Sequence, residues 1–167
     1  MINRRNLIFA TSAVLGASAV SGTLSFSGAA LGSKSGKVFE ITKTEDEWKS
    51  ILSPDQFAVL RKHATERAGT SPLLKEKREG IYACAGCKLP LYKSEHKYDS
   101  KTGWPSFTQA IENALGTKED NTLFITRTEA HCRRCGGHLG HIFEDGPKPL
   151  GKRHCINGLA MVFEPKA

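Results

Sequence analysis

The sequence lacks a basic stripe, an internal repeat and a second hydrophobic segment beyond its N-terminal region. Lysine and arginine are interleaved with aspartate and glutamate, without the aromatic side chains that alternate with bases along a phosphate backbone. We therefore expect no nucleic-acid partner, and contact with a membrane only through the N-terminal region. The 167 residues, 39% hydrophobic and 25% charged, predict one folded domain with its own core, which we expect to be a monomer.

Acidic residues are absent from residues 1–36. Arg4 and Arg5 form a positive start, Leu7 to Val20 form an apolar run, and Ala17-Ser18-Ala19 offers a small-x-small cleavage site. This order predicts an export signal and linker of the Sec or twin-arginine type, and hence a periplasmic protein. An uncleaved membrane anchor is the alternative, although serine and glycine interrupt the run. Removal of the segment lowers the formal charge from +7 to +4, because it carries three bases and no acid.

Helix signals are confined to the start of the remaining domain, residues 37–167. Thr44 and Glu47 form a capping box that predicts a short helix through Ile51. A second capping box at Ser53 predicts another helix, which we expect to end at Gly69. From Gly80 onward, short apolar runs between Gly, Pro, Asn and Asp predict a mainly β fold, a small antiparallel domain of two sheets. The runs are Ile81 to Ala83, Leu91-Tyr92, Leu123 to Thr126, Ile142-Phe143 and Leu159 to Phe163.

Four of the five cysteines form two C-x-x-C pairs, Cys84 with Cys87 and Cys132 with Cys135. Two thiolates from one tight turn can reach adjacent corners of a tetrahedron, so two such pairs predict one closed structural zinc site. The 44 residues between the pairs exceed the spacing of a simple zinc ribbon and must form strands of their own. Two disulfides are the alternative, because an exported protein meets an oxidising compartment. Such short loops would constrain the chain little.

The fifth cysteine, Cys155, lies between Arg153 and Asn157 in a polar stretch. A neighbouring cation stabilises a thiolate, so this setting predicts a nucleophile. A buried, apolar cysteine is the alternative.

Two further stretches carry candidate site residues. His138 and His141 follow directly after the second cysteine pair, which could hold both imidazoles rigidly; they could equally be surface residues or extra metal ligands. Trp104 and Phe107 lie in Gly103-Trp104-Pro105-Ser106-Phe107, where ordinary core packing is the alternative to a binding role.

Taken together and in this order, these stretches resemble the methionine-R-sulfoxide reductase family over nearly all of residues 44–165. The stretches that carry the resemblance are Tyr98-Asp99-Ser100, Gly103-Trp104-Pro105-Ser106-Phe107, Cys132 to His141, Asp145-Gly146-Pro147 and Arg153-His154-Cys155-Ile156-Asn157.

The resemblance implies that the Cys155 thiolate attacks the sulfur of methionine sulfoxide and becomes a sulfenic acid. It also implies supporting roles for other residues. Arg153 would favour the thiolate, and the sulfoxide oxygen would be positioned or protonated by His138, His141 and Asn157. Trp104 and Phe107 would bind the substrate, with Trp104 against its methyl group. Zn²⁺ would hold the fold without touching substrate, and oxidised proteins would be the substrates.

The sequence departs from the family at Thr102, where many relatives carry a resolving cysteine. The resemblance then implies a cycle with one cysteine, completed by a thioredoxin-like protein or a small thiol.

Two other classes of protein remain as alternatives. A cysteine hydrolase is disfavoured because papain-like enzymes carry their cysteine before the histidine and asparagine, the reverse of this order. A non-enzymatic zinc-ribbon interaction module leaves Cys155 and Trp104 unexplained.

Overall fold

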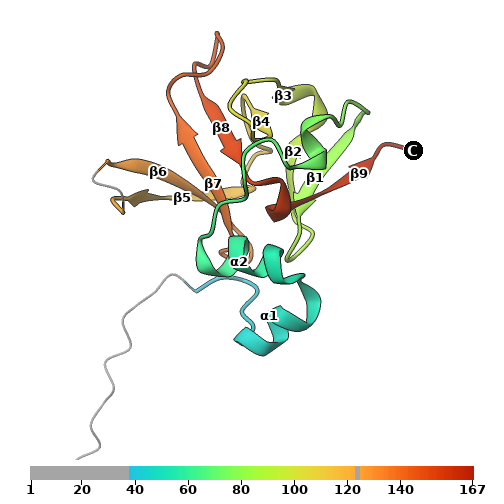
Figure 1. The fold of residues 1–167 in the computed structure, drawn as a ribbon, viewed down its shortest axis with the longest axis vertical. Coiled ribbons are helices and arrows are strands. Elements are labelled where there is room, and N and C mark those ends of the chain that lie inside the picture. The colour runs from blue at the N-terminus through green and yellow to red at the C-terminus, as the bar shows by residue number, and fades with distance from the viewer. Residues whose placement is uncertain (1–37, 123–124) are drawn as a thin grey trace, which may run out of the picture. The chain divides into compact units, whose positions relative to one another are not determined.

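The computed structural model describes residues 38–122 and 125–167 (Figure 1). The expected export signal over residues 1–36 lies outside the described residues and stays a prediction. Within the two described ranges, no helix combines the length and the apolar character needed to cross a membrane.

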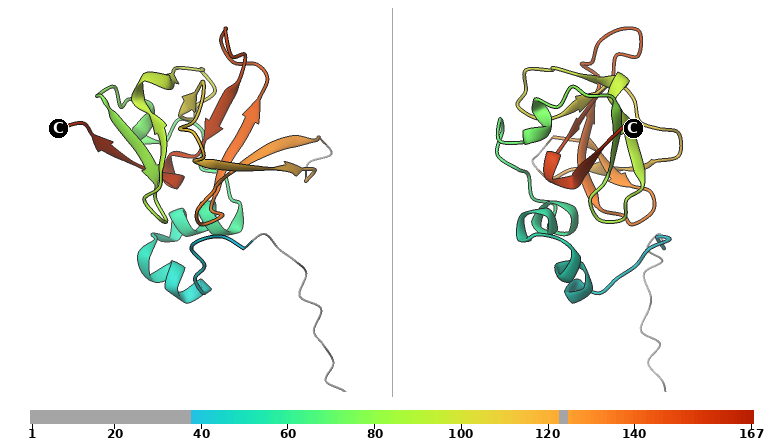
Figure 2. Two further views of the ribbon diagram at one scale, coloured as in Figure 1. Left: turned by 180° about the vertical axis from the view of Figure 1, so that it is seen from behind. Right: turned by 90° about the vertical axis from the view of Figure 1, so that its right-hand side faces the viewer.

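Two short helices begin the fold, α1 (Glu45–Ile51) and α2 (Pro54–Lys62). Both predicted capping boxes are present: the side chains of Thr44 and Ser53 each accept a hydrogen bond from a backbone N–H of the first turn, and Glu47 and Gln56 bond back to the cap residues. The helices lie together at one end of the sheets in every view (Figures 1 and 2). Local side-chain chemistry therefore sets both helix starts.

The predicted end of the second helix is wrong. Instead of continuing to Gly69, α2 ends at Lys62, and His63 adopts a left-handed conformation with φ of 58°. The residues that follow make tertiary hydrogen bonds instead. The Glu66 N–H donates to Asn157 Oδ1 at 2.9 Å, and the Glu66 carboxylate accepts from two backbone N–H groups of the segment after Cys155. These contacts replace the helical ones that the sequence pattern favours.

Nine strands of the described residues form two antiparallel sheets, as expected (Figures 1 and 2). One sheet has three strands in the order β2-β1-β9, and the other has six in the order β3-β4-β8-β7-β6-β5. The strands are β1 (Gly80–Cys84), β2 (Pro90–Lys93), β3 (Lys97–Tyr98), β4 (Ser106–Phe107), β5 (Leu115–Asp120), β6 (Arg127–Cys132), β7 (His138–Phe143), β8 (Arg153–Ile156) and β9 (Met161–Pro165). The described residues also include 3-10 helices: η1 (Pro72–Leu74) lies between α2 and β1, η2 (Ser94–His96) connects β2 to β3, and η3 (Gly158–Ala160) connects β8 to β9.

Two of the expected strands differ from the structure. Ile125 and Thr126 lie in the connection between β5 and β6, where Ile125 is exposed, and residues 123–124 lie outside the described part. The run that starts at Leu159 begins with the 3-10 helix η3, so its strand β9 starts at Met161. Apolar character alone does not distinguish a strand from an exposed loop or from a short 3-10 helix, because both of these also carry apolar side chains.

The core lies between the two sheets and α2. Tyr92 of β2 stacks on Phe107 of β4, with ring centroids 4.2 Å apart, and Tyr82 of β1 packs edge-on against Phe107 at 5.0 Å. All three side chains are fully buried. Aromatic pairs from the small sheet and the large sheet therefore hold the two sheets together.

Candidate active site and metal centre

The two C-x-x-C pairs converge on one point. The sulfurs of Cys84 and Cys135 are 3.8 Å apart, those of Cys87 and Cys132 are 3.5 Å apart, and all four lie within 4.8 Å of one another. A tetrahedral ion with metal–sulfur bonds of about 2.3 Å separates its ligand atoms by about 3.8 Å. None of the four is in a disulfide, so the structure favours a metal site over the disulfide alternative.

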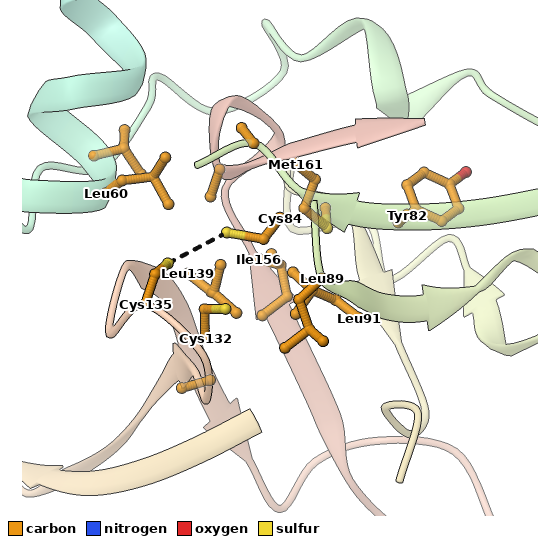
Figure 3. Close-up of a cluster of buried hydrophobic side chains, with 14 of the residues drawn as sticks. Leu60, Tyr82, Cys84, Leu89, Leu91, Cys132, Cys135, Leu139, Ile156 and Met161 are labelled. Atoms are coloured by element: carbon orange, nitrogen blue, oxygen red, sulfur yellow. Dashed lines mark hydrogen bonds between the residues drawn. The ribbon is translucent and has the colours of Figure 1, made fainter. Parts of the chain in front are cut away.

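This metal site is built into the hydrophobic core (Figure 3). Cys84 ends β1 and Cys132 ends β6, so the site joins the three-stranded sheet to the six-stranded sheet. Leu60 of α2 and Leu139 of β7 lie beside the sulfurs, and both are fully buried. Cys84, Cys132 and Cys135 are buried and Cys87 is half-buried, so apolar neighbours keep water from most of the site.

Two of the other candidate residues, Cys155 and His141, lie in one row that crosses the six-stranded sheet. Residues directly opposite each other on neighbouring strands project from the same face. The strand register places Cys155 of β8 opposite His141 of β7 on one side and opposite Ser106 of β4 on the other. The full row runs through Tyr98, Ser106, Cys155, His141, Glu129 and Lys118.

Gly140 permits this register. It is paired with Ile156, and a Cβ atom at this position would lie only 2.1 Å from the carbonyl oxygen of Cys155. The close approach of β7 to β8 therefore requires glycine, and it brings His141 beside the cysteine.

Cys155 opens into a small pocket of about 140 Å³. Trp104 is fixed on one wall, because its Nε1 donates a hydrogen bond to the carbonyl oxygen of Glu66 at 3.1 Å. The pocket residues are Thr65, Trp104, Arg127, Gly140, His141, Phe143, Cys155 and Asn157. Two aromatic side chains beside a thiol and an imidazole suit a small group with an apolar end and a polar end.

Burial and neighbouring polar groups act in opposite directions on the pKa of the Cys155 thiol. Burial raises its pKa, whereas the Thr102 hydroxyl, 3.9 Å from Sγ, and the Arg153 guanidinium lower it. Arg153 is itself held in place by two hydrogen bonds of 2.8 Å to Asp145 and by the Phe143 ring, 4.3 Å from the guanidinium carbon. Burial has the larger effect, so the pKa of Cys155 is raised overall. Arg153 lowers this pKa, as predicted, but does not outweigh burial.

The two histidines occupy different places. His141 lines the pocket, and its Nε2 lies 2.7 Å from Asp120 Oδ2. His138 is buried behind it, with the two ring centroids 5.5 Å apart, and its Nδ1 lies 2.8 Å from Glu129 Oε1. Burial lowers the pKa of His138, and Glu129 opposes that shift. Only His141 of this pair reaches the pocket directly.

Asn157 is bonded to the backbone through both ends of its amide. Its Oδ1 accepts from the Glu66 N–H at 2.9 Å and its Nδ2 donates to the Leu139 carbonyl at 3.0 Å. The side chain therefore ties the segment after Cys155 to two other parts of the fold. Neither bond orients a histidine, which the papain-like alternative would require.

The predicted role of Phe107 is wrong. The resemblance implies that Phe107 binds substrate, yet its side chain is fully buried between Tyr82 and Tyr92 and does not line the pocket. Phe143 provides the second aromatic wall instead. Sequence reasoning also missed residues that stand at or behind the site: Thr65, Asp120, Arg127, Glu129 and Phe143. The strand register would have revealed Glu129, since it is paired with His141.

A half-buried cysteine opposite a histidine, at the mouth of a small aromatic pocket, defines a site for thiol chemistry. Residues 52–165 match the SelR domain family. The protein named peptide methionine sulfoxide reductase MsrB of Methanosarcina mazei is 48% identical over 125 residues, covering 74% of this chain and 89% of the relative. The proteins of that name from Agrobacterium fabrum and Leptospira interrogans are 45% and 43% identical over 127 residues; each alignment covers 75% of this chain, and 94% and 97% of the relatives. The chain belongs to the SelR domain family.

Proposed function

We propose that this protein reduces methionine-R-sulfoxide in oxidised proteins to methionine, with the Cys155 thiolate as the nucleophile. Family membership supports the reaction. The observation that carries the residue assignment is the position of Cys155 directly opposite His141, at a pocket walled by Trp104 and Phe143.

The reaction forms a sulfur–oxygen bond on Cys155 and breaks the one on the substrate. The thiolate attacks the sulfoxide sulfur, a proton reaches the oxygen as it leaves that sulfur, and the products are methionine and a Cys155 sulfenic acid. His141 suits proton delivery because it lines the pocket and is held by Asp120. His138 supports it from behind, and Trp104 receives the methyl group.

Two external thiols return the enzyme to its starting state. The first attacks the sulfenic sulfur, releases water and forms a mixed disulfide, and the second releases Cys155 as a thiol. The position expected to carry a resolving cysteine holds Thr102, 3.9 Å from Sγ. The reductant is a thioredoxin-like protein or a small thiol.

Zinc is the ion proposed for the four-cysteine site. Tetrahedral sets of four thiolates suit Zn²⁺, which would hold the two sheets together there and take no part in the reaction. We propose that the protein acts in the periplasm, because the composition of residues 1–36 is typical of an export signal.

The test uses a peptide that contains a racemic methionine sulfoxide, with excess thiol as reductant. The wild-type protein should stop at roughly half conversion and leave only the S epimer, as resolved by chiral chromatography. Cys155→Ser should keep the circular dichroism spectrum and lose turnover, because an alcohol is a far poorer nucleophile than a thiolate. Thr128→Ser, an exposed change on β6, is the matched control. Complete consumption of both epimers, or turnover by Cys155→Ser, would refute the proposal.

A further inference from the structure

A second group of metal-ligating side chains lies outside the four-cysteine site. The Nδ1 atoms of His63 and His138 both approach Glu129 Oε1, at 3.3 and 2.8 Å. All three ligand atoms lie within 4.8 Å of one another. They come from three separate parts of the fold: the residue after α2, strand β6 and strand β7.

We propose that His63, Glu129 and His138 form a second metal site, which takes a divalent ion of borderline softness such as Zn²⁺. Two imidazoles and one carboxylate are a donor set that such ions accept, with a water in the fourth position. Bonds of about 2.0–2.1 Å in a tetrahedron separate ligand atoms by about 3.3 Å. The separation of His63 Nδ1 from the Glu129 oxygen, 3.3 Å, already has that value, and that of His138 Nδ1, 2.8 Å, has to widen by about 0.5 Å when an ion binds.

The site is open to solvent on one side. It borders a surface hollow of about 690 Å³, with Glu129 and His138 buried and the His63 side chain 51% exposed. An ion can therefore arrive through the hollow, meet His63 first and be held between two rigid strands.

Three side chains of lysine or arginine line the same hollow, and two of them pair with carboxylates other than Glu129. Lys62 is 2.7 Å from Glu45, and Arg127 is 2.6 Å from Asp120. Lys118 competes with the ion for the Glu129 carboxylate, since its Nζ lies 2.9 Å from Glu129 Oε2. Its side chain is 55% exposed, and a partner this exposed is displaced at little cost.

The site adjoins the catalytic pocket through His138, whose ring centroid lies 5.5 Å from that of His141. With a metal ion on Nδ1, the His138 ring keeps its Nε2–H but can no longer become an imidazolium, so an ion here takes this histidine out of proton delivery. Occupation therefore slows the reductase. This consequence rests on the proposed function, whereas the binding itself does not.

Binding is tested in Cys155→Ser protein whose four-cysteine site already holds its ion, so that no free thiolate competes. Titration with Co²⁺ should give weak visible bands of nitrogen and oxygen ligands without the intense near-ultraviolet thiolate bands. Calorimetry with Zn²⁺ should show one further ion per chain. His63→Ala should weaken this binding about tenfold or more. Lys118→Ala should strengthen it, and His96→Ala, a histidine outside the hollow, should leave it unchanged.

The effect of the ion on the reaction is measured in a single turnover. The protein is first reduced with a thiol and then desalted, so that no chelating reductant is present. One added equivalent of Zn²⁺ should slow methionine formation in the parent protein and leave His63→Ala at its uninhibited rate. Absence of a further ion, thiolate bands with Co²⁺, or equal affinity in His63→Ala would overturn the site. If Zn²⁺ bound at this site without slowing methionine formation, the proposed effect on the reaction would be overturned. If the parent protein formed no methionine even without added Zn²⁺, only the proposed function would be contradicted.

Discussion

Burial and charge act in opposite directions on the Cys155 thiol. Burial raises its pKa, and Thr102 and Arg153 lower it. A thiolate is needed for attack on sulfur, so the half-buried position that shapes the pocket also reduces the reactive fraction at neutral pH. Arg153, fixed by Asp145 and Phe143, limits that loss.

Replacement of Arg153 by methionine keeps much of the side-chain volume and removes the charge. Because the guanidinium lowers the pKa of Cys155, Arg153→Met should raise that pKa and move the midpoint of the pH profile for alkylation by iodoacetamide to higher pH. At pH 7 to 8 the alkylation rate should fall several-fold. Lys152→Met, an exposed neighbouring change, is the control. An unchanged midpoint in Arg153→Met would show that the guanidinium does not act on the thiol.

Thr102 lies where an internal resolving thiol would have to be, with its hydroxyl 3.9 Å from Cys155 Sγ. Thr102→Cys should therefore form a disulfide with Cys155 after one equivalent of sulfoxide, since a sulfur–sulfur bond of about 2.0 Å needs only a small movement of the loop. In the parent protein, mass spectrometry should find Cys155 oxidised without any internal disulfide. Thr102→Ser controls for loss of the threonine. A disulfide between Cys155 and a metal-site cysteine in the parent would contradict the one-cysteine cycle.

The segment between α2 and η1 organises the site although it has no regular structure of its own. The buried Glu66 carboxylate accepts from the N–H groups of Gly158 at 2.5 Å and Leu159 at 3.0 Å, and so caps η3. The Glu66 carbonyl accepts from Trp104 Nε1. One residue thus connects the pocket wall with the turn that follows Cys155.

Glu66→Ala should lower the free energy of unfolding by about 1–3 kcal/mol, because the buried N–H of Gly158 and the half-buried N–H of Leu159 lose their acceptor. Turnover should also fall, since the turn after Cys155 loses its anchor. Denaturant unfolding and steady-state kinetics measure the two effects. Glu66→Gln, which retains one acceptor oxygen, should recover part of both. A Glu66→Ala protein with parental stability would show that these hydrogen bonds contribute nothing net.

Sequence reasoning succeeded where the determining contacts are local. Both helix starts depend on capping residues three positions apart, and each metal-binding turn depends on a C-x-x-C pair. It failed where contacts are distant in sequence: the end of α2 depends on bonds from Glu66 to residues 91 to 93 positions away. Glu129 and Phe143 were missed, and Phe107 misassigned, because pocket walls depend on strand register and packing.

At the scale of the whole domain, the four-cysteine site joins parts that the backbone leaves separate. Cys84 and Cys87 flank the turn from β1 to β2 in the small sheet, and Cys132 and Cys135 flank the turn from β6 to β7 in the large sheet. The buried apolar side chains around these cysteines form one core cluster with them. Loss of the ion would leave four thiols at the junction of both sheets and α2.

Cys84→Ser tests this dependence, because it removes one of the four ligands and leaves Cys155 untouched. A structural zinc ion contributes about 10–16 kcal/mol of apparent binding free energy, as large as the roughly 5–15 kcal/mol that stabilises a typical domain. The variant should therefore lose its zinc, measured by atomic emission, and unfold at a much lower temperature or fail to fold. Cys155→Ser, the matched control, should keep one zinc per chain and the parental Tm, since Cys155 lies outside the metal site. Chelation of the ion from the parent protein should reproduce the Cys84→Ser result without any mutation. A purified parent without zinc, or a Cys84→Ser variant as heat-stable as the parent, would exclude a structural zinc ion at this junction.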